Sequence, residues 1–237
     1  MARCLLPDGR CGRIGTPCPS KACVARTLRR LHERRWRDRL GLFFVEGEDA
    51  VAAATAEPVE LLRAGDDVEP GLLAEVATAP HPPRVVAVYR RADLPGWEQR
   101  GATLALWRLA DPGNVGTLIR AADAFGAGIA LSAGCADPTG SKALRASMGS
   151  IFRVPLAGFD EGAGRRVALV PRGGTPLPEL VPGGEIVLVL GAEREGLPPD
   201  VVERCDERVS IPQPGGGESL NVAMAGAIAL YELSHRA

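Results

Sequence analysis

The chain has 237 residues, 46% of them hydrophobic and 24% charged, with a formal net charge of −1. This composition is that of an ordinary soluble protein with one large or two small domains. No apolar run approaches the ~20 residues that a membrane-spanning helix needs, and the first residues lack the apolar core of a signal peptide, so we expect a cytoplasmic protein with no membrane partner.

Residues 1–25 are predicted to form a loop-rich or disordered N-terminal extension, because Pro and Gly interrupt this stretch repeatedly. Four cysteines, Cys4, Cys11, Cys18 and Cys23, lie within it. Zinc binding is the alternative interpretation, but their spacing lacks the paired CxxC knuckles of common structural zinc sites. We therefore expect reduced cysteines and no bound metal.

Basic residues gather at the N-terminal end. Residues 1–40 contain eleven Arg and Lys against three Asp and Glu, a formal excess of eight in a chain whose total is −1. Such a surface would attract a polyanion such as RNA. A solvated arginine-rich helix face is the alternative, and charge alone does not separate the two. The candidate RNA contacts here are Arg29, Arg30, Arg34 and Arg35.

Residues 26–97 are predicted to form a small α/β domain. The first helix has an apolar side, and it is followed by a strand over 42–45, a helix over 49–56 and a strand over 85–89. The apolar side consists of Leu28, Leu31, Trp36 and Leu40. The polar stretch from residue 90 to 97, which Pro95 and Gly96 interrupt, is the predicted linker.

Residues 98–237 alternate between strand and helix patterns, which indicates a parallel sheet covered by helices. The predicted strands are 103–107, 128–132, 166–170, 185–190 and 207–211. The predicted helices are 114–125, 141–149, 199–205 and 219–233.

The helix predicted at 114–125 contains the first candidate functional residues. Its apolar residues recur at helical spacing, with Asn114 as the predicted N-cap and Gly126 at its C-terminal end. Arg120 lies off the apolar stripe, so we expect its side chain to point away from the core.

Two later segments resemble ligand-binding loops. The apolar strand 185–190 opens at Gly191 into a polar loop, and ligands of open α/β sheets bind at such carboxyl ends. After Ile211, a Pro/Gly-rich turn leads into a helix whose predicted N-cap is Ser219. The glycines at 215–217 would let a ligand approach the main chain closely.

In this order the three segments resemble the three motifs of the SpoU family of RNA ribose 2′-O-methyltransferases, within the SPOUT superfamily. The stretch 142–155 also follows the family pattern, and the resemblance covers about residues 26–235. The matching motif residues are Asn114, Gly116, Arg120, Gly126, Gly191, Glu193, Gly196, Pro212, Ser219, Leu220 and Asn221. The first domain resembles the accessory domain of many SpoU enzymes, which implies recognition of folded RNA by shape and backbone.

The resemblance implies a catalytic domain with a deep trefoil knot, S-adenosylmethionine as cofactor, and a homodimer whose sites use both chains. Arg120 would stabilise the developing charge on the ribose 2′-oxygen, while Asn114 and Asn221 orient substrate or loops. Ser219 would assist Arg120, and Glu193 would position arginine or cofactor. The cofactor contacts carried over are Leu190, Gly191, Ile211, Pro212 and Leu220, and the further RNA contacts are Lys142, Arg145 and Arg153.

Purely structural roles are the alternative interpretation of these residues. Asn114 and Ser219 could be simple helix caps, and Arg120 could form a surface ion pair with Asp123. A Rossmann dehydrogenase and a P-loop nucleotidase are disfavoured because their glycine fingerprints are missing. A non-catalytic RNA-binding protein of the same fold is the serious rival. Ribosomal RNA is the expected substrate because of the accessory domain, while transfer RNA and a role in antibiotic resistance are open alternatives.

Overall fold

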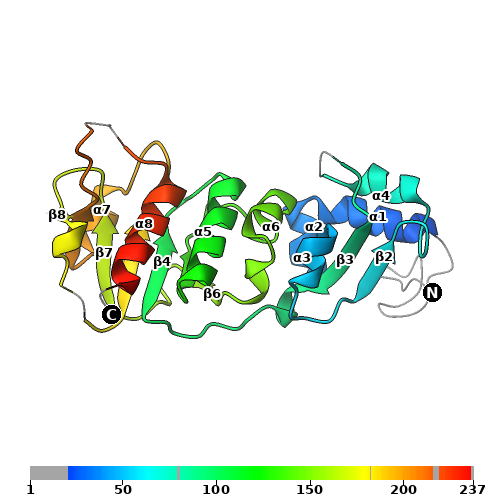
Figure 1. Cartoon of the computed structure of the whole chain (residues 1–237), viewed down its shortest axis with the longest axis horizontal. Coiled ribbons are helices and arrows are strands. Elements are labelled where there is room, and N and C mark those ends of the chain that lie inside the picture. Colours follow the sequence, from blue (N-terminus) through cyan, green and yellow to red (C-terminus); the bar gives the residue numbers. More distant parts are fainter. Residues whose placement is uncertain (1–20, 79–80, 182, 216–218, 236–237) are drawn as a thin grey trace. The chain divides into compact units, whose positions relative to one another are not determined.

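The computed structural model describes residues 21–78, 81–181, 183–215 and 219–235. The predicted extension falls mostly outside this range, as do Cys4, Cys11, Cys18 and the side chain of Cys23. The chain forms two compact units: one runs up to Leu94 and includes Thr139–Phe152, and the other holds Pro95–Pro138 and the chain from Arg153 onward. The chain therefore passes from one unit to the other three times (Figure 1). Among the described residues, no helix is both long and apolar enough to cross a membrane.

The N-terminal unit is built on a three-stranded antiparallel sheet in the order β1-β3-β2. Its centre is apolar, with fully buried side chains such as Phe43, Leu62 and Leu73. The strands are β1 (Leu42–Glu46), β2 (Glu60–Arg63) and β3 (Val85–Arg90). The helices are α1 (Lys21–Leu31), α2 (Arg34–Leu40), α3 (Glu48–Ala52), α4 (Pro70–Val76) and the short 3-10 helix η1 (Arg91–Asp93).

The single first helix expected from the sequence is instead two helices, α1 and α2. The break is stabilised by Arg37, which is only 5% exposed and donates 2.8 Å hydrogen bonds to the carbonyl oxygens of Leu31 and His32. These carbonyls lie at the C-terminal end of α1, where helical partners run out. A buried guanidinium thus replaces the hydrogen bonds that a continuous helix would have made.

The segment Thr139–Phe152 belongs to the N-terminal unit, although the sequence placed it in the catalytic domain. It contains α6 (Ser141–Ser147) and the 3-10 helix η2 (Ser150–Phe152), and the Phe152 ring lies 4.8 Å from that of Tyr89. Gly149 has φ +81°, and a Cβ on it would lie 2.4 Å from the Cβ of Ala53. Glycine is therefore required for the chain to pack this closely against the residue that follows α3.

The C-terminal unit contains a seven-stranded sheet in the order β6-β5-β4-β9-β7-β10-β8, and all its pairings are parallel. The central strand β9 (Ile186–Leu190) is buried along its whole length, as expected for a strand covered on both faces. The other strands are β4 (Ala102–Leu106), β5 (Gly128–Leu131), β6 (Leu156–Gly158), β7 (Arg165–Leu169), β8 (Thr175–Pro176) and β10 (Glu207–Ser210). The helices are α5 (Pro112–Ala124), the 3-10 helix η3 (Leu177–Glu179), α7 (Pro199–Glu203) and α8 (Val222–Ser234).

The helices α5 and α8 lie side by side over the sheet (Figure 1). Their close approach depends on Gly226 of α8, where an added Cβ would lie 2.4 Å from Leu118 Cδ2 and 3.0 Å from Leu190 Cδ2. The absence of a side chain at Gly226 therefore allows the two helices and the sheet to pack closely within one chain.

Both predicted N-caps in this unit are wrong. The α5 helix begins with Pro112, and Asp111 is its cap, accepting hydrogen bonds from the amides of Gly113 (2.7 Å) and Asn114 (3.0 Å). The α8 helix is capped by Asn221 rather than Ser219. In each case an Asp or Asn stands where its side chain can accept from the first free amides, and Pro at the first helical position favours the earlier start of α5.

Candidate active site

The carboxyl ends of β4 and β9 meet at one edge of the parallel sheet. Leu106 is paired with Leu190, and the amide of Trp107 continues the register by donating a 2.8 Å hydrogen bond to the Leu190 carbonyl. The strands β7 and β10 end at the same edge. Loops that follow these strands are therefore brought together, as expected for a ligand site in an α/β fold.

A cavity of about 570 Å³ lies at this edge. Of the five predicted cofactor contacts, Leu190, Gly191, Ile211 and Leu220 line it, whereas Pro212 is exposed and is not part of the lining. The other lining residues are Leu169, Val170, Pro171, Ala192, Glu193, Arg194, Glu195, Gly196, Leu197, Gln213, Ser219, Asn221, Val222 and Ala225.

Sequence reasoning missed Leu169 at the end of β7, the following residues Val170 and Pro171, and also Gln213. A signal for the first group was available, because the predicted strand 166–170 is one of several parallel strands whose carboxyl ends share an edge.

The loop after β9 is held in a tight, closed form. Reciprocal hydrogen bonds of 3.2 and 2.9 Å join the main chains of Ala192 and Gly196. A Cβ on Gly191 would lie 2.2 Å from the carbonyl carbon of Gly196, and Gly196 itself has φ +67°. Both glycines are therefore required by the geometry of the loop that forms this wall of the cavity.

Three of the predicted catalytic residues form a continuous hydrogen-bonded chain. Asn221 Nδ2 donates to Asn114 Oδ1 (3.2 Å), and Asn114 Nδ2 donates to Glu193 Oε1 (3.1 Å). The same Glu193 oxygen also accepts from the amide of Asp111 (3.3 Å). This network joins the start of α5, the loop after β9 and the start of α8, three segments far apart in the sequence.

Ser219 and Arg120 lie outside this hydrogen-bonded network. Ser219 is exposed and lines the cavity. Arg120 is exposed on α5 and is not among the residues that line the cavity. The expected ion-pair alternative with Asp123 is not found, because Asp123 accepts from Arg153, with Nη2 to Oδ2 at 2.6 Å. Hydrogen bonding to Asp123 raises the pKa of Arg153.

Most of the predicted RNA contacts have protein partners. Arg145 contacts the Glu46 carboxylate, which also accepts from Thr78, and Arg153 contacts Asp123. On the first two helices, ion pairs join Arg29 to Glu75 (2.5 Å), Arg34 to Asp38 (3.7 Å) and Arg35 to Glu33 (2.6 Å). In the part of the chain that the structure describes, no group of three or more His, Cys, Asp or Glu could hold a metal ion.

Comparison with known families places these features in context. The model of the SpoU rRNA Methylase family matches residues 101–231, which include the whole hydrogen-bonded network. An uncharacterised tRNA/rRNA methyltransferase of Synechocystis is 32% identical, over 88% of this chain and 89% of its own. The 23S rRNA guanosine 2′-O-methyltransferase RlmP of Bacillus subtilis is 31% identical, over 86% of this chain and 93% of its own.

Solved structures resemble both units of the chain. The AdoMet-bound SpoU methyltransferase AviRb of Streptomyces viridochromogenes has a TM-score of 0.79 at 27% identity, over 90% of this chain and 97% of its own. An AdoMet-bound rRNA methyltransferase of Sinorhizobium meliloti has a TM-score of 0.78 at 28% identity, over 90% and 94%. The predicted fold class, a SPOUT-type parallel-sheet domain after a smaller α/β domain, is confirmed. The threading that would form a trefoil knot stays a prediction, because strand order alone does not define it.

Proposed function

The chain belongs to the SpoU rRNA methylase family, and we propose that its sheet-edge cavity binds S-adenosylmethionine beside the network of Asn114, Glu193 and Asn221, where a ribose 2′-hydroxyl of RNA is positioned. The protein is an S-adenosylmethionine-dependent RNA 2′-O-methyltransferase. The observation that carries the site assignment is the hydrogen-bonded chain that joins three motif residues at the cavity.

The cavity fits this cofactor in size and in lining. Its volume of about 570 Å³ is within the range of small-molecule sites, about 300–1,000 Å³. Leu190, Ile211 and Leu220 offer apolar surface, and the Gly191 main chain is not shielded by a side chain. When bound, S-adenosylmethionine supplies a methyl group that its sulfonium has already activated.

The residues beside the cavity have two tasks in this proposal. The asparagines and Glu193 fix the loops relative to one another, so that a ribose is held in one orientation, and such positioning can lower a barrier by several kcal/mol. Arg120 stabilises negative charge as the 2′-oxygen loses its proton. A guanidinium is a poor proton acceptor, so its contribution is electrostatic.

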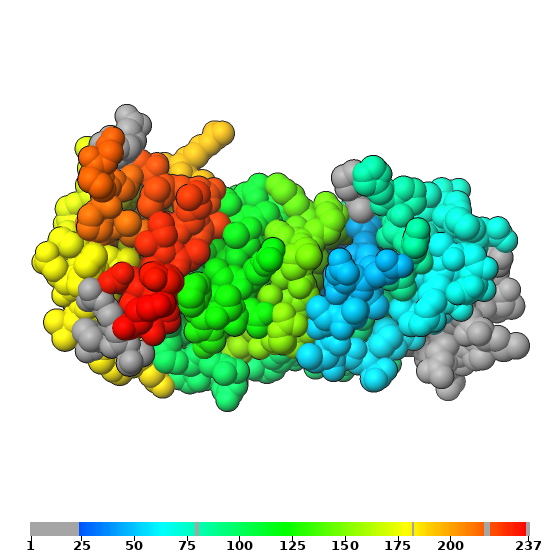
Figure 2. Space-filling model, in the orientation of Figure 1, coloured from blue at the N-terminus to red at the C-terminus, as the bar shows by residue number. Residues whose placement is uncertain are grey.

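We propose that a second copy of the chain covers the outer face of α8. Met224, Ile228 and Tyr231 are 58%, 38% and 53% exposed and follow one another at helical spacing. Figure 2 shows this helix in red at the surface beside α5 in green. Large apolar side chains in such a stripe favour a partner surface. A homodimer would also bring Arg120, which does not line its own cavity, toward a shared site.

The dimer is tested by light scattering of the wild type and of a Met224→Glu, Ile228→Glu variant. A dimeric wild type and a monomeric variant would support the proposal. A wild type that is monomeric at micromolar concentration would contradict it.

We propose ribosomal RNA as the substrate and the cytoplasm as the compartment. The relative RlmP, which matches most of the chain, is named as a 23S rRNA enzyme, and this supports the choice of RNA. Mapping of 2′-O-methylated nucleotides in total RNA, with and without the gene, tests it. A site that is lost from ribosomal RNA supports the proposal, and a site that is lost only from transfer RNA contradicts it.

Calorimetry separates the enzyme from its rival, a non-catalytic RNA-binding protein. The enzyme is expected to bind S-adenosylmethionine without RNA, because the cavity is already formed in the single chain. Absence of binding would favour the rival.

A further inference from the structure

One loop residue of the C-terminal unit has an unfavourable backbone conformation. Arg108, in the loop that leads from β4 to α5, has φ +50°. In the described part of the chain, the only other non-glycine residue with a positive φ is Met148, the C-cap of α6, where a left-handed residue is common. Arg108 follows a strand and has no such explanation, and a Cβ disfavours this conformation. It persists only where the surroundings impose it.

Hydrogen bonds hold the loop around Arg108 in place. The Arg108 amide donates a 2.7 Å hydrogen bond to Ser132 Oγ, at the end of β5. The carbonyl of the next residue, Leu109, accepts a 2.8 Å hydrogen bond from the amide of Ala136. On either side of these two residues the loop is joined to β9 and to Glu193. The surroundings therefore impose the backbone conformation and fix the point from which the Arg108 side chain starts.

The Arg108 side chain runs across the turn that follows β5. Gly134 of this turn has φ +93°, and a Cβ on it would lie 3.5 Å from both Cγ and Nε of Arg108. The stem of the side chain is therefore packed over Gly134. Because Arg108 is nevertheless exposed, its guanidinium is accessible to solvent.

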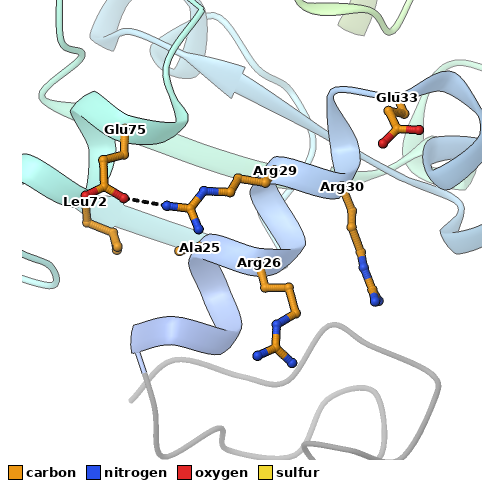
Figure 3. A pocket seen from close by; sticks show the side chains of 7 residues that line it. All are labelled: Ala25, Arg26, Arg29, Arg30, Glu33, Leu72 and Glu75. Atoms are coloured by element: carbon orange, nitrogen blue, oxygen red, sulfur yellow. Dashed lines mark hydrogen bonds and ion pairs between the residues drawn. The ribbon is translucent and has the colours of Figure 1, made fainter.

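Arg108 differs from the arginines that form ion pairs. In the hollow of the N-terminal unit that Figure 3 shows, the Arg29 side chain reaches across to Glu75. In the C-terminal unit, Arg153 pairs with Asp123. Within the described residues, no carboxylate pairs with the Arg108 guanidinium. A guanidinium is always charged, so this cation is available to an anion from outside the chain.

The position of Arg108 favours an RNA phosphate over the carboxylate of the cofactor. Arg108 is not among the residues that line the sheet-edge cavity. It precedes Asp111, whose amide donates to Glu193 of the hydrogen-bonded network, by three residues, so the α carbons of Arg108 and Asp111 are at most about 11 Å apart. A ribose at the network is joined to a phosphate on each side, and the long Arg108 side chain can reach the backbone next to it.

We propose that Arg108 binds a phosphate of the RNA backbone next to the target ribose, and that the hydrogen-bonded loop holds it in place for this contact. The inference rests on the proposed function and deepens it by assigning a backbone contact to the catalytic unit. The forked N–H donors of a guanidinium match the oxygens of a phosphate. An arginine whose main chain and stem are already held loses less conformational freedom on binding.

The test is the salt dependence of RNA binding by the full-length protein, measured by filter binding to purified bacterial 23S rRNA. Arg108→Gln removes the charge and keeps much of the side-chain length. We expect affinity to fall about threefold to tenfold, and the slope of log affinity against log salt to become shallower by roughly 0.7–0.9, the value for one phosphate contact. Arg108→Lys keeps the charge and is expected to keep the wild-type slope.

Two further variants separate a phosphate contact from a structural role. Arg108→Gly removes the side chain but is compatible with a positive φ, so we expect the same shallower slope as in Arg108→Gln with no fall in melting temperature. Arg208→Gln is the matched control. Arg208 is exposed on β10 of the same unit, does not line the cavity, and has no ion-pair partner in the described ranges of the chain, so its loss should leave the slope unchanged.

A wild-type slope in both Arg108→Gln and Arg108→Gly would overturn the proposal, as would an equal change of slope in Arg208→Gln. Where the Gln and Gly variants differ, or where Arg108→Gln has a lower melting temperature, Arg108→Gly decides. Methyl transfer to the same RNA is measured in parallel. A wild type that shows the Arg108-dependent slope but transfers no methyl group would contradict the proposed function while leaving the phosphate contact intact.

Discussion

The two units use their polar side chains in opposite ways. In the N-terminal unit, the exposed arginines Arg29, Arg34 and Arg35 lie on helix surfaces and are paired with carboxylates. In the C-terminal unit, Asn114, Glu193 and Asn221 come from three separate segments and bond to one another beside a cavity. A charged surface can attract a polyanion wherever it lies, whereas chemistry at one atom requires groups held in a fixed geometry.

The largest effect that this contrast predicts is on Arg120 in the C-terminal unit. Arg120→Ala should lower the rate of methyl transfer about 100-fold to 1,000-fold, as removal of one charge-stabilising group does in other enzymes. Binding of S-adenosylmethionine should not change, because Arg120 does not line the cavity. Single-turnover transfer from labelled cofactor measures the rate, and calorimetry measures the affinity. A folded variant with the wild-type rate would remove Arg120 from the mechanism.

The next effect concerns the cofactor loop. In Gly191→Ala the new methyl group would lie 2.2 Å from the Gly196 main chain, so the loop must move. Overpacking of this kind typically costs about 1–3 kcal/mol, and we expect cofactor affinity to fall about tenfold or more. Calorimetry with S-adenosylmethionine measures it.

The matched control for this glycine lies in the other unit. Gly71 of α4 has nothing within 4 Å of an added Cβ, so Gly71→Ala should bind cofactor as the wild type does. Unchanged affinity in Gly191→Ala would mean that the loop adjusts freely and does not form a defined wall of the site.

A smaller effect is expected at Asn114, where a comparison with Asp111 distinguishes a role in catalysis from a role in helix capping. Asn114→Ala breaks two hydrogen bonds of the network but leaves Asp111 to cap α5. We expect about a tenfold loss of rate and a change in stability below about 1 kcal/mol. Asp111→Ala should instead lower the free energy of unfolding by about 1 kcal/mol. Rate and thermal unfolding are measured on both variants, and a large loss of stability in Asn114→Ala would contradict the separation.

The smallest effect is expected for the paired arginines of the N-terminal unit. Arg34→Ala should change affinity for 23S rRNA by less than about twofold, because this exposed side chain lies beside Asp38. Filter binding at low and high salt checks it. A loss of about tenfold or more would mean that this arginine contacts RNA directly despite its ion pair.

The sequence predicted the parallel sheet well, because buried strands such as 186–190 are continuous apolar runs that periodicity identifies. It also identified the three segments that the hydrogen-bonded network joins, and four of its five expected cofactor contacts line the cavity. It missed the break between α1 and α2 because that break depends on a buried arginine, Arg37, which a pattern of apolar residues interprets as surface. It misplaced both helix caps by two or three residues, since several neighbouring residues were competent to cap.

Other features could not have been predicted from local pattern. The hydrogen bond between Asn114 and Asn221 joins residues 107 positions apart and depends on how α8 packs against α5. The partner of Asp123 is Arg153, 30 residues away, rather than the nearby Arg120. Such pairings depend on tertiary packing, and the local sequence around either residue does not determine them.

Because the chain crosses between the two units three times, the C-terminal unit cannot be isolated by a single truncation. Cutting after Leu94 would not yield a clean catalytic fragment, because the insert from Thr139 to Phe152 would stay behind without its docking surface. The ring of Phe152 would lose Phe43 and Tyr89, and the Arg145 guanidinium would lose Glu46. A catalytic fragment would therefore have to replace the insert as well, because a simple truncation would expose apolar side chains such as Phe152 to solvent.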